Sequence, residues 1–341
     1  MDDLDRQILT WLQKEIPLVR RPFEAIGKKL GTDGGDILLR INRLKDQKII
    51  RQISAIFDTK SLGYKSMLVA MRFPESKIDA AAEVINQHPG VSHNYKRSHD
   101  FNLWFTVAVP PQDSLEEHIQ RLHELSGAEK TLKLPTLKLY KIGVKLDLTG
   151  KESKEDSADE IYDEARRRKE APDLTVFEIE VIRSMQEDLP LRDEPYLKIA
   201  SGMGTTEEEL FRTLESFRVR GYLRRMAGIL HHRRAGFAAN SMFVWQIPEE
   251  RLEEAGMQFA LFREVSHCYK RPVYPEFPYA IYTMVHAAKV SDCELIAQRM
   301  EEKVGKWPRL NLLSTKEYKK IRLKYFTKEL EDWWASSAVT R

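Results

Sequence analysis

A five-residue motif occurs twice in this chain of 341 residues. It is His93-Asn94-Tyr95-Lys96-Arg97 in the first half and His267-Cys268-Tyr269-Lys270-Arg271 in the second. A Val-Ser pair precedes each copy, and half the length of the chain separates the two. The sequence therefore predicts a tandem duplication, in which one structural unit is built twice.

Each copy of this His-x-Tyr-Lys-Arg motif lies in a short run of residues typical of a β-strand. Side chains alternate between the two faces of a strand, so the histidine, tyrosine and arginine of one copy share a face. For a single copy, a polar stripe facing solvent is the simpler explanation. Because the same three residue types recur in two halves that have otherwise diverged, we favour a shared functional site.

Composition excludes several classes of protein. With 42% hydrophobic residues the chain can bury more than one core, and its length favours two or more domains. No apolar run is long enough to span a membrane, and the acidic start Met1-Asp2-Asp3 is unlike a signal peptide, so we expect a cytoplasmic protein. Cys268 and Cys293 lack the spacing of a zinc or iron–sulfur site. The net charge of +3 neither requires nor excludes a nucleic-acid partner.

The residues before each motif predict a winged helix-turn-helix, over 1–62 and again over 173–236. Both segments show helical apolar spacing, contain a Pro-Leu-x-x-x-Pro-aromatic sequence, and continue with two further short helices and strand-like residues. We expect three helices and a strand pair in each segment. Thr205 or Thr206 is the expected N-cap of the last helix in the second segment.

A second module follows each winged segment, over 63–149 and over 237–341. Its predicted order is βαββαβ, which is that of a ferredoxin-like fold. The last strand is expected at 136–144 in the first half and at 311–318 in the second, where a C-terminal helix with an aromatic end follows. Residues 150–172 are too highly charged to build a core and predict a linker. The predicted fold class is therefore α+β, a tandem repeat of winged helix-turn-helix and ferredoxin-like modules.

This architecture resembles the leucine-responsive (Lrp/AsnC) family of transcription regulators, whose second module dimerises and binds small effectors. More specific sequences resemble a different family. The first motif with Phe101-Asn102-Leu103-Trp104-Phe105-Thr106 is similar to the A subunit of siroheme decarboxylase, and the second motif with residues 272–279 and 282–286 is similar to the B subunit. The resemblance implies a fused enzyme whose two halves pack as an intramolecular pseudo-heterodimer.

The activity implied by the resemblance is the removal of carbon dioxide from two acetate side chains of siroheme. The product, didecarboxysiroheme, lies on an alternative route to heme, and related proteins act towards heme d1. The substrate ring can itself accept electrons, so no organic cofactor is expected. The expected ligand is an iron tetrapyrrole, with siroheme as the substrate and a bound heme as an alternative occupant.

The residue types in the motif suit this chemistry. The ring and the new methyl carbon must be protonated, and histidine can hold or release a proton near neutral pH. Arginine stays charged and binds carboxylates through two hydrogen bonds. We therefore assign His267 and His93 as proton donors, Arg271 and Arg97 as carboxylate-binding residues, and Tyr269 and Tyr95 as residues that orient the carboxylates.

Residues found only in the second half favour it as the principal pocket. The loop 272–279 is rich in aromatic residues and proline, which suits a wall against a flat macrocycle. His232 stands where the B subunit has a histidine, so it could ligate the siroheme iron or bind a carboxylate; an exposed basic turn is the alternative. His286 shares a strand face with Tyr282, and there core-lining side chains are the alternative. The predicted substrate-binding residues are His232, Arg233, Tyr274, Tyr279, Tyr282 and His286.

Two other functions compete with catalysis. In a DNA-binding regulator, the third helix of each winged segment should carry positive charge. Arg40 and Arg43 meet this expectation in the first half, whereas Glu207-Glu208-Glu209 begins the corresponding helix in the second and opposes phosphate binding. Nucleic acid is therefore not an expected partner. A non-catalytic heme or siroheme carrier would use the same pocket residues, and a further homodimer is compatible with each function.

Overall fold

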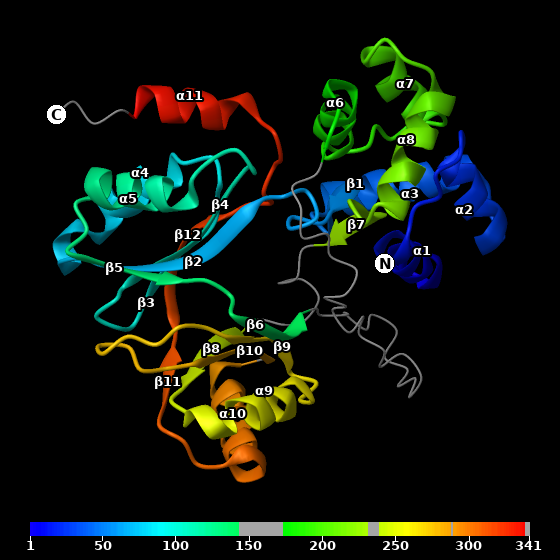
Figure 1. Cartoon of the computed structure of the whole chain (residues 1–341). Coiled ribbons are helices and arrows are strands. Elements are labelled where there is room, and N and C mark those ends of the chain that lie inside the picture. The colour runs from blue at the N-terminus through cyan, green and yellow to red at the C-terminus, as the bar shows by residue number, and fades with distance from the viewer. Residues whose placement is uncertain (143–172, 231–238, 288, 338–341) are drawn as a thin grey trace.

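The computed structural model describes residues 1–142, 173–230, 239–287 and 289–337. In Figure 1 the helices of the two winged segments lie together on one side of the molecule, and two larger sheets lie on the other. Both regions contain elements from both halves of the chain. The duplication therefore produces one intertwined molecule and not two separate domains in series.

Each half begins with three short helices whose ends are set by local sequence. Asp2 and Asp5 form a reciprocal capping box at the first helix, and Pro22 and Pro195 occupy first turns, where no backbone donor is needed. Thr206 caps the third helix of the second half by accepting a hydrogen bond from a backbone N–H of its first turn. The helices are α1 (Asp3–Lys14), α2 (Pro22–Leu30), α3 (Gly34–Asp46), α6 (Val176–Met185), α7 (Pro195–Gly202) and α8 (Glu207–Val219).

The strand after each helical segment pairs with its counterpart from the other half. β1 (Ile50–Phe57) and β7 (Leu223–Leu230) form a two-stranded antiparallel ribbon in which Ala55 lies opposite Met226. The sequence predicts a strand pair within each winged segment, whereas the described pair joins the two segments. One apolar cluster accordingly contains residues of α1, α3, α6 and α8, so the two winged segments share a core.

Each of the two larger sheets takes one strand from the opposite half. The first sheet has the order β12-β3-β4-β2-β5, and the second has the order β11-β8-β10-β9-β6. The first half supplies β6, which pairs with β9, and the end of the chain supplies β12, which pairs with β3. The strands are β2 (Lys65–Arg72), β3 (Val91–Arg97), β4 (Leu103–Val109), β5 (Lys130–Leu134), β6 (Lys138–Ile142), β8 (Ala239–Trp245), β9 (Val265–Lys270), β10 (Ile281–Ala287), β11 (Arg309–Leu312) and β12 (Ser314–Lys320).

This exchange corrects the prediction of a single last strand in each half. The chain leaves one sheet and enters the other between Leu134 and Lys138, and again at Leu313, which separates β11 from β12. Pro135 follows β5 and lacks the N–H that would continue the ladder. The pattern of residues reveals strand-like segments, but the sheet that each segment joins is decided by residues distant in the chain.

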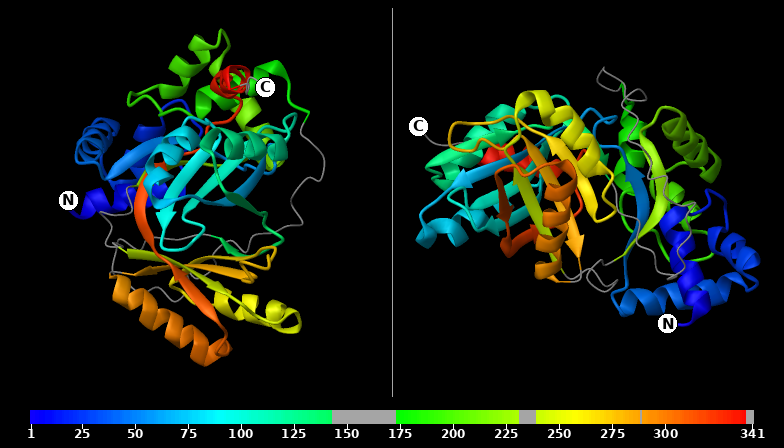
Figure 2. Two further views of the ribbon diagram at one scale, coloured as in Figure 1. Left: turned by 90° about the vertical axis from the view of Figure 1, so that its left-hand side faces the viewer. Right: turned by 90° about the horizontal axis from the view of Figure 1, so that it is seen from below.

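Helices cover the outer faces of the two sheets, as Figures 1 and 2 show. α4 and α5 pack on the first sheet, and α9 and α10 pack on the second. No helix in the described ranges could span a bilayer, since even α10 has only 15 residues. These helices are α4 (Ile78–Asn86), α5 (Leu115–Ser126), α9 (Leu252–Ala260) and α10 (Val290–Val304), with a 3₁₀ turn before α4 (Glu75–Lys77) and before α9 (Glu249–Arg251).

The inner faces of the two sheets pack against each other. A buried cluster between them combines Trp104 and Leu134 of the first half with Val244 and Leu312 of the second. This arrangement confirms the predicted α+β tandem repeat. It also gives the molecule an interior that belongs to both halves.

The C-terminal helix, α11 (Lys328–Ser336), packs on the layer formed by α4 and α5. Trp333 is buried in the core cluster of the first sheet and its helices. The Arg121 guanidinium lies 3.4 Å from the centre of the Trp334 ring, and that ring stacks on His118 with 4.3 Å between ring centres. The last helix of the chain therefore extends the core of the first-half module.

Candidate active site

The first motif lies on β3, and the second lies on β9 and ends at Arg271, one residue past that strand. The histidine, tyrosine and arginine of each motif face the opposite sheet. The intervening residues mark the other face of each strand. The Asn94 amide donates hydrogen bonds to Ala82 and Asn86 on α4, and Cys268 Sγ lies 3.6 Å from the Gly256 carbonyl oxygen on α9. Strand alternation therefore places the histidine, tyrosine and arginine side chains in the interior between the sheets.

A β-bulge lies at the start of each motif. The register of β3 against β4 shifts between Val91 and His93, and that of β9 against β10 shifts beside His267. A bulge re-aims local side chains, and here a serine lies next to each histidine. Ser92 Oγ lies 3.0 Å from His93 Nδ1, and Ser266 Oγ lies 2.7 Å from His267 Nδ1. Because Nδ1 of each histidine lies within hydrogen-bond distance of the serine, Nε2 is the ring nitrogen that is available to contact a ligand.

Both motif histidines are weak bases in this environment. Burial, followed by the charges of His286, His93 and Arg271, lowers the pKa of His267 to about 4. The pKa of His93 is also lowered, by burial and then by the charge of Lys320 on β12. Both imidazoles are therefore neutral at pH 7. Carboxylates of an anionic ligand would favour the protonated forms, so binding of such a ligand would raise both pKa values.

Arg97 and Arg271 are buried arginines for which the described chain provides no carboxylate partner. They are 6% and 8% exposed. Arg97 Nη1 donates a hydrogen bond of 2.6 Å to the Leu312 carbonyl oxygen, and Arg271 Nη1 donates one to the Leu134 carbonyl oxygen. Within the described residues, the Nε atom of each arginine has no hydrogen-bond partner. Burial lowers the pKa of both, that of Arg97 to about 10. A buried cation with unused donors is costly unless an anion binds it, so both positions suit ligand carboxylates.

The motif tyrosines pack between the histidine and the arginine of the same strand. The ring centres of Tyr95 and His93 lie 6.3 Å apart, and the Arg97 guanidinium carbon lies 5.6 Å from the centre of the Tyr95 ring. In the second motif the corresponding distances are 6.0 and 4.8 Å. The aromatic ring therefore restricts the orientation of the neighbouring arginine.

β10 contributes two of the predicted residues to the second motif. Tyr282 packs with its ring centre 5.5 Å from the Arg271 guanidinium, and its buried hydroxyl has no hydrogen-bond partner in the described part of the chain. His286 Nε2 lies 2.7 Å from Ser266 Oγ. Because Ser266 also contacts His267, these three residues form a hydrogen-bonded histidine–serine–histidine triad.

The loop 272–279 packs the two halves together. Tyr274 donates a hydrogen bond of 2.6 Å to the Lys133 carbonyl oxygen in the first half. Phe277 is fully buried, its ring centre lies 5.6 Å from that of Trp104, and Tyr279 packs against it at 5.0 Å. The central side chain of the loop fills the apolar interior between the halves, and the role of the loop as a wall against a macrocycle stays a prediction. Tyr274 and Tyr279 lie beside that packing.

Four residues remain to be compared with the prediction: two that it included and two that it missed. His232 and Arg233 lie outside the described residues, so their roles stay predictions. The described chain has no group of histidine, cysteine and carboxylate residues that could hold a metal ion. The prediction missed Ser92 and Ser266, although the Val-Ser pair before each motif was the signal that could have found them.

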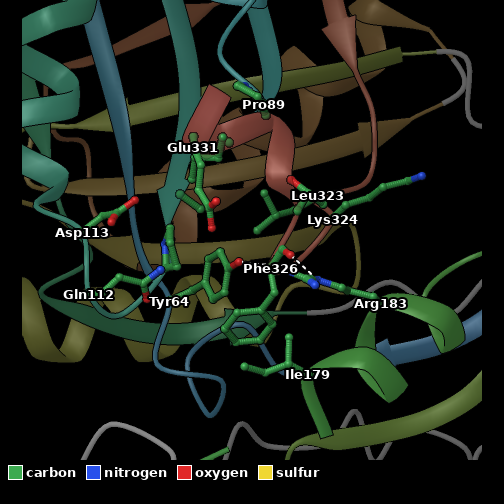
Figure 3. Close-up of a pocket in the computed structure, with 15 residues that line it drawn as sticks. Tyr64, Pro89, Gln112, Asp113, Ile179, Arg183, Leu323, Lys324, Phe326 and Glu331 are labelled. Carbon is green, nitrogen blue, oxygen red and sulfur yellow. Dashed lines mark hydrogen bonds between the residues drawn. The ribbon is translucent and has the colours of Figure 1, made fainter. Parts of the chain in front are cut away.

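A cavity of about 300 Å³ lies between the first-half module, α6 and the C-terminal segment (Figure 3). Tyr64, Asp113 and Glu331 line it, together with Arg183, whose Nε donates a hydrogen bond of 2.5 Å to the Phe326 carbonyl oxygen. None of the motif residues is among those that line it. This cavity is therefore separate from the candidate active site.

Comparison with known proteins finds a family model for each part of the fold, and each model matches twice. The winged segments match the siroheme decarboxylase NirDL-like HTH domain at residues 5–51 and 178–224, and the sheet modules match the AsnC-like ligand binding domain at 61–141 and 234–319. The chain is 39% identical over 329 residues to a siroheme decarboxylase of Hydrogenobacter thermophilus, and the match covers 96% of each chain. The chain belongs to the siroheme decarboxylase family.

Other siroheme decarboxylases are similar to the whole chain or to part of it. The crystal structure of the siroheme decarboxylase NirDL in co-complex with an iron-uroporphyrin III analogue has 33% sequence identity and a TM-score of 0.78, over 98% of each chain. The siroheme decarboxylase alpha subunit of Desulfovibrio desulfuricans is 40% identical over 144 residues, which make up 42% of this chain and 83% of that subunit. Separate subunits in some siroheme decarboxylases fit the pairing of two halves in this one.

Proposed function

We propose that this protein is a siroheme decarboxylase, a carboxy-lyase that removes carbon dioxide from two acetate side chains of siroheme and gives didecarboxysiroheme. Family membership over the whole length of the chain supports the activity. The observation that carries the choice of ligand is the pair of buried arginines, Arg97 and Arg271, that lack a carboxylate partner in the described chain. An anionic tetrapyrrole brings several carboxylates on one rigid ring and suits this pair.

Each decarboxylation consumes one proton. The bond between the carboxyl carbon and the acetate methylene breaks, carbon dioxide leaves, and the electron pair passes into the conjugated ring before a C–H bond forms at the new methyl group. We assign His267 and His93 as the proton donors, through Nε2, because the adjacent serine contacts Nδ1 in both motifs. Arg271 and Arg97 bind the carboxylates of the tetrapyrrole, since a guanidinium offers two parallel donors to each.

The aromatic residues orient the ring and its side chains. Tyr269 and Tyr95 pack on the arginines and keep the guanidinium planes directed across the interface. The hydroxyl of Tyr282, which has no hydrogen-bond partner among the described residues, is suited to donate a hydrogen bond to a carboxylate. Tyr274 and Tyr279 contribute at the border with the first half.

DNA binding is the weaker alternative, because the third helices of the winged segments lack free positive charge. Arg40 and Arg43 on α3 form ion pairs with Asp5, and Arg40 also pairs with Asp2. The carboxylate of Glu207 is buried at the start of α8. Neither helix presents the cationic face that phosphate groups attract.

Anaerobic incubation with siroheme, read by the mass of the product, tests the proposal. We expect the loss of two molecules of carbon dioxide, and heat-denatured protein is the control for spontaneous loss. Siroheme recovered unchanged from its complex with the protein would identify a carrier. Absence of any interaction with siroheme, together with a salt-dependent shift of duplex DNA, would identify a regulator.

Three finer assignments belong to the same proposal. His232 ligates the siroheme iron or binds a carboxylate, and the optical spectrum of bound siroheme in His232→Ala tests ligation, since an unchanged spectrum would exclude it. The product serves the synthesis of heme or heme d1 in the cytoplasm. A homodimer of the fused chain is tested by light scattering.

A further inference from the structure

The hydrogen bonds of the histidine–serine–histidine triad allow proton transfer from His286 towards His267. His286 Nε2 and His267 Nδ1 each lie 2.7 Å from Ser266 Oγ. A serine hydroxyl has one hydrogen and two lone pairs, so Ser266 can accept a hydrogen bond from His286 and donate one to His267. The Met284 carbonyl oxygen, at 3.3 Å, is the more distant acceptor. Ser266 is 2% exposed, so the triad is shielded from solvent at its centre.

The first half has a shorter arrangement. Opposite the motif histidine, β4 has Thr106 and β10 has Met284. Two residues further along, β4 has Ala108 where β10 has His286, and Ala108 lines the cavity shown in Figure 3. No second histidine is described beside Ser92. Among the described residues, therefore, only one of the two motif histidines is linked through its serine to a second imidazole.

A neutral imidazole donates a proton effectively only if another proton reaches its second nitrogen. Burial lowers the pKa of His267 to about 4, so its imidazole is neutral at pH 7 unless ligand carboxylates raise this pKa above 7. Loss of the Nε2 proton alone would leave an imidazolate anion, which is strongly basic and costly to bury. Arrival of a proton at Nδ1 in the same step avoids that anion. Ser266 is the group that contacts Nδ1.

We propose that Ser266 and His286 are positioning residues that supply protons to His267 during decarboxylation. This inference rests on the proposed function. As the new methyl C–H bond forms, the Nε2–H bond of His267 breaks, the hydroxyl proton of Ser266 moves to Nδ1, and the Nε2 proton of His286 moves to the serine oxygen. His286 takes a proton from solvent at Nδ1. One proton enters for each carbon dioxide released, no oxidant or reductant takes part, and water restores the original tautomers after product release.

Single-turnover decarboxylation of siroheme by matched variants tests this supply. The hydroxyl of Ser266 is removed in Ser266→Ala, and the second imidazole is removed in His286→Ala. The matched control is Ser92→Ala, which removes the equivalent hydroxyl of the first half. We expect the first two variants to slow decarboxylation by about 10- to 100-fold, because a positioned proton donor contributes roughly 10²–10⁴-fold. The Kd of Ser266→Ala for siroheme, measured by absorbance titration, should be unchanged. Ser92→Ala should slow the reaction at least about tenfold less than Ser266→Ala.

Chemical rescue separates proton supply from a merely structural role. Added imidazole should restore much of the rate of His286→Ala, and it should not restore Ser266→Ala, whose missing hydroxyl it cannot replace. If the wild-type protein is active, equal rates for Ser266→Ala and Ser92→Ala would overturn this inference but not the proposed function. Failure of imidazole to rescue His286→Ala would do the same. A wild-type chain that releases no carbon dioxide would instead overturn the proposed function.

Discussion

The two copies of the motif keep the same arginine geometry but differ in what stands behind the histidine. Arg97 and Arg271 both reach across the interface to a backbone carbonyl oxygen of the other half. His267 contacts Ser266, which in turn contacts a second imidazole, whereas among the described residues no second imidazole contacts the Ser92 beside His93. The comparison teaches that duplication has preserved the part of each site that holds an anion, and has changed the part that handles protons.

Removal of each motif histidine is the strongest way to break this comparison. We expect His267→Ala to reduce kcat by about 10²–10⁴-fold, the usual contribution of a positioned proton donor, and His93→Ala to reduce it less. Product mass under anaerobic turnover measures both, and it also detects singly decarboxylated intermediates. Equal losses in the two variants would mean that the histidines share one role despite their different surroundings.

Replacement of each motif arginine by lysine sharpens the conserved side of the comparison. Arg271→Lys and Arg97→Lys keep the charge but lose the paired donors, so each should weaken siroheme binding by about tenfold, since hydrogen bonds to charged groups contribute about 1.5–3 kcal/mol. Absorbance titration with siroheme measures the Kd. An unchanged Kd in one variant only would show that the two halves also differ in how they hold the substrate. Thermal unfolding of both variants controls for the lost contacts with Leu312 and Leu134.

A pair of buried histidines beneath α11 adds to the first half a pH-dependent contribution to stability that the helices of the second half lack. His88 Nε2 lies 2.9 Å from His118 Nδ1, and both rings pack against Trp333 of α11. Burial lowers the pKa of His88 to about 3 and that of His118 to about 4. The helices α9 and α10 of the second half contain no histidine. Acid should therefore loosen the helices that cover the first sheet before those that cover the second.

The sign follows from proton binding. Below the ordinary histidine pKa of 6.5 the unfolded chain binds protons that the folded chain does not. The contribution of this histidine pair to the free energy of unfolding is therefore complete above pH 6.5 and decreases as the pH falls towards 4. For His88 alone the slope is on the order of 1 kcal/mol per pH unit. Urea unfolding between pH 7.5 and 4.5 measures it, with His88→Gln as the comparison. The same slope in both proteins would contradict the prediction.

A charge reversal at equivalent positions is the mildest test. Arg21 and Glu194 each precede the proline that begins α2 or α7, and they form an ion pair of 3.2 Å between the halves. Arg21→Glu or Glu194→Arg alone should lower the Tm slightly, because exposed ion pairs contribute little. The double variant should recover the Tm of the wild type. If it does not, this pair does not help to match one half to the other.

Local patterns in the sequence were enough to predict most of the elements and the faces of the motif strands, although not the division of the last strand of each half into two. The alternation of residues in the two motifs predicts that His93, Tyr95 and Arg97 share a face, and Asn94 does turn to the opposite one, towards α4. The order βαββαβ likewise follows from local spacing. These features depend on residues close together in the chain, so a single sequence reveals them.

Features that depend on distant residues could not be predicted in this way. The pairing of Glu317 with Tyr95, and the contact of Arg271 with Leu134, join residues more than a hundred positions apart. The bulges that place Ser92 and Ser266 beside the histidines arise from the register between two strands, which the sequence of one strand does not determine. The burial of Phe277 likewise depends on Trp104 in the other half.

The pairing of β12 with β3 imposes an order on the synthesis of the protein. β3, which carries His93, pairs along one side with β12, which follows it in the chain by more than two hundred residues. Until β12 is made, β3 is an open sheet edge, and an open edge invites unwanted strand pairing. We expect nascent chains that end before Ser314 to lack a complete site and to need protection at this edge. Neither sheet can be completed until both halves of the chain have been synthesised, because each sheet contains a strand from the other half.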